Sequence, residues 1–226
     1  MKIRPLFLTV VLFAFLSGCA STPKSIIAAP DFNMRNQSTK KVGVLLAGSF
    51  IFELQVGGKK ALNKEWSDQA APILTKVSID QLKTAGYSVK PIKLDDLSFK
   101  YIATFNNIPR ETISRYVYAA RPIDTIEKEK FDAFLKAEDL DALVLVRGID
   151  HVSSGGRQAM RVVAGLLGAG TSSGIAHVEM AMLDKSRTLI FYSHKYEDGK
   201  DLRTEEGTAH LFNEIIEDMK TLNSSK

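Results

Sequence analysis

The sequence predicts an α/β domain: a mixed sheet of about five strands with a C-terminal antiparallel hairpin, and helices packed on the sheet. Apolar runs of strand length alternate with segments of helical period over most of the chain, which is typical of α/β proteins. Near the C-terminus two strand-like runs follow each other with only a short polar segment between them, which indicates a hairpin. We expect one domain, over residues 41–226.

The first half of this domain contains two predicted strands and a helix between them. Residues 42–47 are a near-continuous apolar run followed by Gly48, as expected for a strand buried on both faces. Apolar residues recur every three or four positions between 62 and 82, which predicts an amphipathic helix that starts near Pro72 or is kinked there. Residues 87–93 predict a second strand, with Pro91 at an edge or a strand end.

Two further helices lead into a third strand. Asn107-Ile108-Pro109 resembles a cap followed by a first-turn proline, which predicts a short helix through Ile113 and Val117. A second helical segment covers residues 124–137, and residues 141–148 form another buried apolar run. Because a helix delivers the chain into this strand, we expect a crossover connection and parallel pairing.

The predicted hairpin joins residues 174–183 to residues 188–196. With Lys185 and Ser186 as the two loop residues, one face of the hairpin would belong to the core. The facing pairs on that side would be Val178 with Ser193, Met180 with Phe191, and Met182 with Leu189. A terminal helix begins near Thr204, and its apolar stripe should pack on the sheet.

The N-terminus predicts a lipoprotein signal peptide over residues 1–18. Lys2 and Arg4 precede an apolar run over residues 6–16, which is too short to span a membrane. Leu16-Ser17-Gly18-Cys19 resembles the lipobox of bacterial lipoproteins, and Cys19 is the only cysteine of the chain. The resemblance implies a diacylglycerol anchor on the thiol of Cys19. The alternative is an ordinary cleaved signal peptide that leaves an unpaired thiol.

The segment after the predicted signal peptide connects the anchor to the domain. Residues 19–40 are polar and aperiodic, and we interpret them as a lipidated flexible tether. Ala20, where some lipoproteins have aspartate, resembles the signal for the outer membrane, so the domain would face the periplasm. Cleavage before Cys19 lowers the formal net charge from +4 to +2, and no basic cluster predicts nucleic-acid binding. With its only thiol lipidated, the domain would have no disulfide and no cysteine nucleophile.

A glycine-rich segment precedes the hairpin. A phosphate-binding loop has a lysine and a hydroxyl residue directly after its last glycine. The glycines between residues 165 and 174 are not followed by such a pair and lead into a strand, so we interpret the segment as a flexible connection. Its apolar side chains also make it a candidate interface with a membrane or with another copy of the chain. The candidate interface residues are Met160, Val162, Val163, Leu166, Leu167, Gly168 and Gly170.

Histidines supply the candidate metal and catalytic residues. The expected hairpin register places His177 opposite His194, with Glu179 as the next residue on that face, a set that could bind zinc or copper. The alternative is a solvated sheet face, and we expect no cofactor. Asp150-His151 at the end of a strand could form a hydrolytic pair or a loop cap, and Asp95-Asp96 reads as a solvated turn. Elsewhere no catalytic motif is present, so we expect a protein that is not an enzyme.

A resemblance to bacterial envelope lipoproteins extends chiefly over residues 142–192. Arg161, the spaced glycines that follow it, and the strand ending in Asp184 resemble an uncharacterised class of cell-envelope lipoproteins. The order of elements is similar to the domain of the curli secretion lipoprotein and of the lipoprotein activators of peptidoglycan synthases. Lys185-Ser186-Arg187-Thr188 replaces the family's usual Asp-x-x-x-Gly turn.

The resemblance implies a non-enzymatic periplasmic domain that binds an envelope protein or assembles with copies of itself. The alternative is an oligomeric pore or secretion-channel subunit, which would extract into detergent as a discrete large ring.

Overall fold

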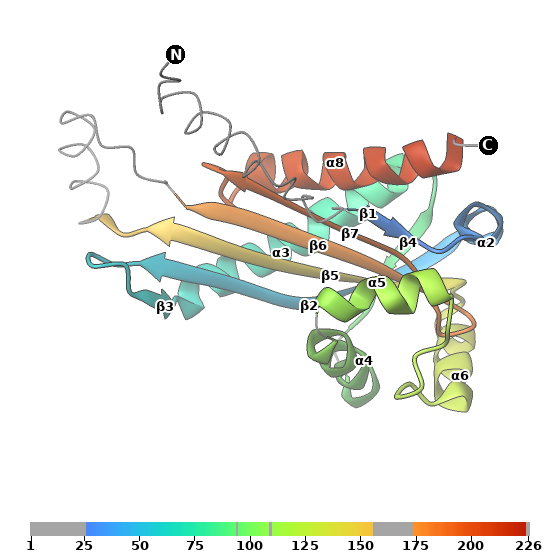
Figure 1. Cartoon of the computed structure of the whole chain (residues 1–226). Coiled ribbons are helices and arrows are strands. Elements are labelled where there is room, and N and C mark those ends of the chain that lie inside the picture. Colours follow the sequence, from blue (N-terminus) through green and yellow to red (C-terminus); the bar gives the residue numbers. More distant parts are fainter. Residues whose placement is uncertain (1–25, 94, 109, 156–173, 225–226) are drawn as a thin grey trace, which may run out of the picture.

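The fold is a seven-stranded mixed sheet with helices on both faces (Figure 1), which confirms the predicted α/β class and the C-terminal hairpin. The computed structural model describes residues 26–93, 95–108, 110–155 and 174–224. The strands are β1 (Ile26–Ala28), β2 (Lys41–Leu54), β3 (Lys60–Leu62), β4 (Ser88–Pro91), β5 (Ala142–Ser153), β6 (Ile175–Asp184) and β7 (Leu189–Asp198). Their order across the sheet is β1-β7-β6-β5-β2-β3, and β4 pairs with β2.

The helices form two layers. They are α2 (Phe32–Ser38), α3 (Lys64–Thr84), α4 (Asp96–Asn107), α5 (Arg110–Ala119), α6 (Lys128–Glu138) and α8 (Glu205–Ser224). Helices α3 and α8 cover one face of the sheet, and α4 and α5 lie on the opposite face (Figure 1). No helix of the described segments is long and apolar enough to cross a membrane.

Strand β2 pairs with three other strands of the sheet. It pairs in parallel with β5 along its whole length and with β4 at its beginning, while β3 pairs antiparallel with its end. The parallel pairing predicted for the strand after residue 140 is therefore confirmed. Because helices cover both faces, the first part of β5 is buried without alternation, from Ala142 to Val146.

Helix α3 continues through Pro72, which neither begins nor ends it. Its N-terminus is set by Asn63, whose side-chain oxygen accepts a hydrogen bond from the Trp66 amide at 3.1 Å. The terminal helix α8 buries the predicted apolar stripe against the sheet, including Leu211, Phe212 and Ile215.

The Asp95-Asp96 pair is the beginning of a helix, and the prediction of a solvated turn there was wrong. Asp95 caps α4: its carboxylate accepts a hydrogen bond from the Ser98 amide, and the Ser98 hydroxyl accepts one from the Asp95 amide, both at 2.7 Å. This reciprocal pair is a capping box. Its second member here is serine instead of the usual glutamate or glutamine, so the sequence lacks the pattern by which a capping box is normally recognised.

Part of the predicted tether over residues 19–40 is folded. Strand β1 pairs antiparallel with β7, with Ile27 facing Tyr192, and Phe32 of α2 is buried against the core. Arg35 pairs with both Asp31 and Asp184, and the Tyr87 hydroxyl donates to Asn36. The fold therefore includes residues from position 26, and the predicted domain boundary at 41 lies too far along the chain.

The hairpin is shifted by two residues from the predicted register. The loop contains four residues, Lys185 to Thr188, with Arg187 in the left-handed conformation at φ 61° and a register irregularity after Met182. Met180 consequently faces Ser193 and Met182 faces Phe191. A shift of two preserves the face of every side chain, so the predicted core face is retained.

Candidate functional site

A pocket of about 680 Å³ opens at the end of the sheet where β5 finishes and β6 begins. The strands place its side chains in a row across the face that carries α4 and α5: Ile149 pairs with His177, and His177 pairs with Tyr196. The pocket is lined by Leu54, Gly58, Lys60, Ile149, His151, Gly174, Ile175, His177, His194 and Tyr196.

The histidines of the pocket make ring contacts with their neighbours. The His177 and His194 rings meet edge to face with centroids 5.7 Å apart, and His194 stacks on Tyr196 at 6.5 Å. His151 stacks on Phe52 of the adjacent strand at 5.4 Å. Ile175 and Tyr196 are 43% and 64% exposed, so an approaching molecule meets them first.

One ammonium group adds charge to the pocket. The Lys60 Nζ lies 3.3 Å from the His151 Nε2. Burial, and secondarily the charge of Lys60, lowers the pKa of His151, so its imidazole is neutral near pH 7. The described lining contains no carboxylate, and its polar groups are imidazoles, a phenol and an ammonium. Such a set suits a ligand that accepts hydrogen bonds or carries negative charge.

A buried ion pair forms the next row along the same face. Arg147 of β5 faces Glu179 of β6, and its Nε donates to the Glu179 Oε2 at 2.9 Å. The Arg147 Nη1 donates to the Asn106 side-chain oxygen at 3.1 Å, and the Asn106 amide group donates to the Ala47 carbonyl at 2.9 Å. The guanidinium also lies over the Phe105 ring. This network connects α4 to the sheet beside the pocket.

The predicted metal set of His177, Glu179 and His194 shares one face, but its members do not assemble as predicted. His177 faces Tyr196, and Glu179 faces His194. The Glu179 side chain is completely buried and bound by Arg147, so this face is not the solvated surface of the alternative interpretation. Among the described residues, the group whose ligand atoms all lie within 4.8 Å of one another is Glu197, His210 and Glu214 instead.

The predicted Asp150-His151 pair is split between the two faces of the sheet. Consecutive residues of a strand point in opposite directions, so His151 lines the pocket while Asp150 points toward the α3 and α8 layer. Asp150 is completely buried, and burial raises its pKa to about 6. The two side chains cannot act as a hydrolytic dyad in this arrangement.

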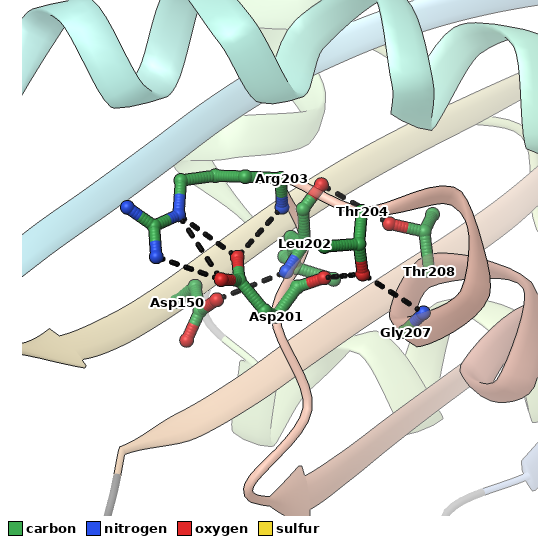
Figure 2. A network of polar contacts seen from close by, with 7 residues as sticks. All are labelled: Asp150, Asp201, Leu202, Arg203, Thr204, Gly207 and Thr208. Atoms are coloured by element: carbon green, nitrogen blue, oxygen red, sulfur yellow. Dashed lines mark hydrogen bonds and ion pairs between the residues drawn. The ribbon is translucent and has the colours of Figure 1, made fainter.

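Asp150 instead anchors the turn that begins α8 (Figure 2). Its carboxylate accepts a hydrogen bond from the Leu202 amide at 3.0 Å. The Thr204 hydroxyl accepts one from the Gly207 amide at 3.1 Å and so caps the helix. Arg203 pairs with Asp201 and lies over the Trp66 ring of α3 at 4.4 Å. The network fixes both the start and the direction of α8.

Two groups of predicted site residues lie outside the described residues. These are Cys19, the predicted lipid attachment site, and the candidate interface residues Met160, Val162, Val163, Leu166, Leu167, Gly168 and Gly170. Sequence reasoning missed Lys60, Ile149 and Tyr196 as pocket residues. The sequence pattern around them gave no signal, because they come from β3, β5 and β7, and the pairing of these strands through β2 and β6 brings them together from distant parts of the chain.

Among known proteins, this chain is similar only at a low level to the solved structures that we describe below. No family model matches the chain, and no curated protein matches it. Among solved structures, the PelC dodecamer from Paraburkholderia phytofirmans has 9% sequence identity and a TM-score of 0.35, covering 79% of this chain and 85% of that one. A variant of the same dodecamer gives the same values. The resemblance over residues 142–192 to envelope lipoproteins stays a prediction.

Proposed function

We propose that the chain is an outer-membrane lipoprotein, anchored through Cys19, whose periplasmic domain is a non-enzymatic binding component of the cell envelope. The observation that carries the binding role is the 680 Å³ pocket with three imidazoles, a phenol and an ammonium on a partly apolar wall. A cleft of this size with a few convergent polar groups is typical of ligand-binding sites. The lipobox at residues 16–19 supports the anchor.

The chemistry of the pocket supports binding more than catalysis. Asp150 lies on the other face of the sheet from the pocket histidines. The Glu179 carboxylate lies 3.5 Å from the His177 Nε2, but it is held in an ion pair by Arg147, which makes it a weaker partner for a general base. The described lining also offers no serine, threonine or cysteine as a nucleophile. What it offers is hydrogen bonding, positive charge and ring faces.

The position of β1 relates the pocket to the anchor. Ile26 pairs with Ser193, the residue before His194, so β1 begins next to a pocket residue of β7. Residues 19–25 can extend no further than roughly 25 Å, because each residue adds at most about 3.5 Å. An anchor on Cys19 would therefore keep the pocket close to the membrane surface, where an envelope component can reach it.

The experiment is in-cell photo-crosslinking with a photoreactive amino acid at Tyr196, followed by mass spectrometry. The matched control is Tyr118, which is 51% exposed on α5 and does not line the pocket. We expect a discrete adduct from position 196 that is absent from position 118 and is reduced at least about tenfold in a His177→Ala, His194→Ala double variant, the ratio for a loss of 1.4 kcal/mol.

Equal labelling from positions 196 and 118 would contradict the proposal, as would an adduct that persists unchanged in the double variant. The double variant must show the same melting temperature as the parent, so that loss of the adduct reports the pocket and not unfolding. Recovery of a chemically altered small molecule, in place of an adduct, would favour an enzyme.

A further inference from the structure

We propose that Glu197, His210 and Glu214 form a binding site for a divalent transition-metal ion such as Zn²⁺. The three residues come from the end of β7 and the first turns of α8. Their ligand atoms all lie within 4.8 Å of one another. This site is separate from the pocket: Tyr196 and Glu197 are consecutive strand residues, so they point to opposite faces of the sheet.

The two carboxylates converge on a single nitrogen atom. The His210 Nε2 lies 2.7 Å from the Glu197 Oε2 and 3.7 Å from the Glu214 Oε1. One N–H can donate well to only one of these oxygens. A metal ion among the three atoms would contact all of them, at the 2.0–2.2 Å or so that zinc adopts with imidazole and carboxylate ligands.

The charges of the site also favour a dication. The two carboxylate side chains together offer two negative charges, which a divalent ion balances. Lys200 also lies beside the site: its Nζ is 3.7 Å from the Glu197 Oε1, the oxygen that does not face His210. Imidazole combined with carboxylates selects transition metals over calcium and magnesium, which prefer oxygen ligands.

The backbone holds these ligands in place before any metal arrives. His210 and Glu214 are four residues apart, so they lie on the same side of α8. Next to them, Leu211, Phe212 and Ile215 are buried against the sheet, and the turn before the helix is fixed by Asp150 and Thr204 (Figure 2). Glu197 is fixed by the pairing of β7 with β6.

The site also has room for further ligands. The side chains of Glu197, His210 and Glu214 are 39%, 43% and 47% exposed. Water, or a group from a binding partner, can therefore occupy the remaining coordination positions. Three protein ligands with an open position are the arrangement of zinc sites that exchange an external ligand.

The test is isothermal titration of the purified protein in detergent with Zn²⁺, comparing the parent with His210→Ala and Glu214→Gln. We expect one ion per chain, and about tenfold or greater loss of affinity in each variant, since even loss of an outer-sphere contact costs roughly 10–100-fold. The matched control is Glu217→Gln, which removes a 67% exposed carboxylate from the same helix and should leave the affinity unchanged.

Absorption spectra with Co²⁺ in place of Zn²⁺ give a second readout, because the visible bands should be lost in His210→Ala. The substituted residues are exposed, and equal melting temperatures without metal will show that the variants fold. Absence of binding at millimolar Zn²⁺ would overturn the proposal. Binding that survives in both variants, or that is lost in His194→Ala instead, would also overturn it.

Discussion

Asp150 is a buried carboxylate whose role in this fold is structural. It lies in sequence beside a histidine, which suggests chemistry, but its hydrogen bond to the Leu202 amide makes it part of the frame that starts α8. Burial is the largest cause of its raised pKa, with a further contribution from the nearby charge of Asp201, while Arg203 acts in the opposite direction. The result is a carboxyl group whose ionisation opposes folding.

The pKa of Asp150 predicts a loss of stability with rising pH. Its pKa of about 6 in the folded protein exceeds the ordinary 3.8, so the folded state binds the proton more tightly. Protonation of Asp150 therefore stabilises the folded state fully below pH 3.8. This contribution to the free energy of unfolding is lost as the pH rises through 6 and is absent above it. The difference of two pKa units corresponds to ~3 kcal/mol.

Urea unfolding of the parent and of Asp150→Asn between pH 4 and pH 8 measures this effect. We expect the unfolding free energy of the parent to fall relative to that of the variant over pH 4 to 7, because asparagine retains an acceptor for the Leu202 amide without ionising. A difference between the two that does not vary with pH would contradict the assigned role.

At the scale of elements, the ion pair of Arg147 and Glu179 joins three pieces of the fold. It lies between β5 and β6, and Asn106 extends it to α4. Removal of one member of a buried pair leaves an uncompensated charge, which typically costs about 3–5 kcal/mol. We expect Arg147→Met to lose this much unfolding free energy, measured by urea denaturation.

The double variant Arg147→Met, Glu179→Leu should regain most of that loss, since neither charge then remains buried. Lys41→Met is the surface control: it breaks the exposed pair with Asp139 and should change the unfolding free energy little. A loss in Arg147→Met no greater than in the control would show that the pair is not buried as described.

The elements with strong apolar patterns could be predicted from the sequence, and those held by tertiary contacts could not. Strands β2 and β5 and helix α8 follow their patterns because burial on a sheet face dictates them. Strand β1 has only three residues and forms because β7 offers a free edge to pair with. Helix α2 has no strong apolar pattern. The hairpin register depends on Arg187 at positive φ, a conformation that an arginine in the sequence does not predict.

The candidate site was predicted in part for the same reason. Alternation along β6 and β7 correctly placed His177, Glu179 and His194 on one face, because a two-residue error in register preserves the face. Burial of that face depends on α4, which the sequence did not reveal, and on Arg147, which is 32 residues from its partner. The Glu197, His210 and Glu214 cluster needs the docking of α8 on β7.

For the whole molecule, the fold is compatible with the predicted lipoprotein signal at the N-terminus. The sheet carries a pocket next to the start of β1, and a covalent lipid on Cys19 would hold that part of the domain near a membrane. A diacylglycerol there would supply strong attachment, since each buried methylene adds about 0.8 kcal/mol of membrane affinity. We expect Cys19→Ala to move the protein from the membrane fraction to the soluble fraction.

The measurement that tests the central claim, a domain working from a lipid anchor, is the mass of the N-terminal peptide of the protein extracted from cell membranes. The account predicts a peptide that begins at Cys19 and carries a thioether-linked diacylglycerol. A peptide that begins elsewhere, or one with an unmodified Cys19 thiol, would contradict it.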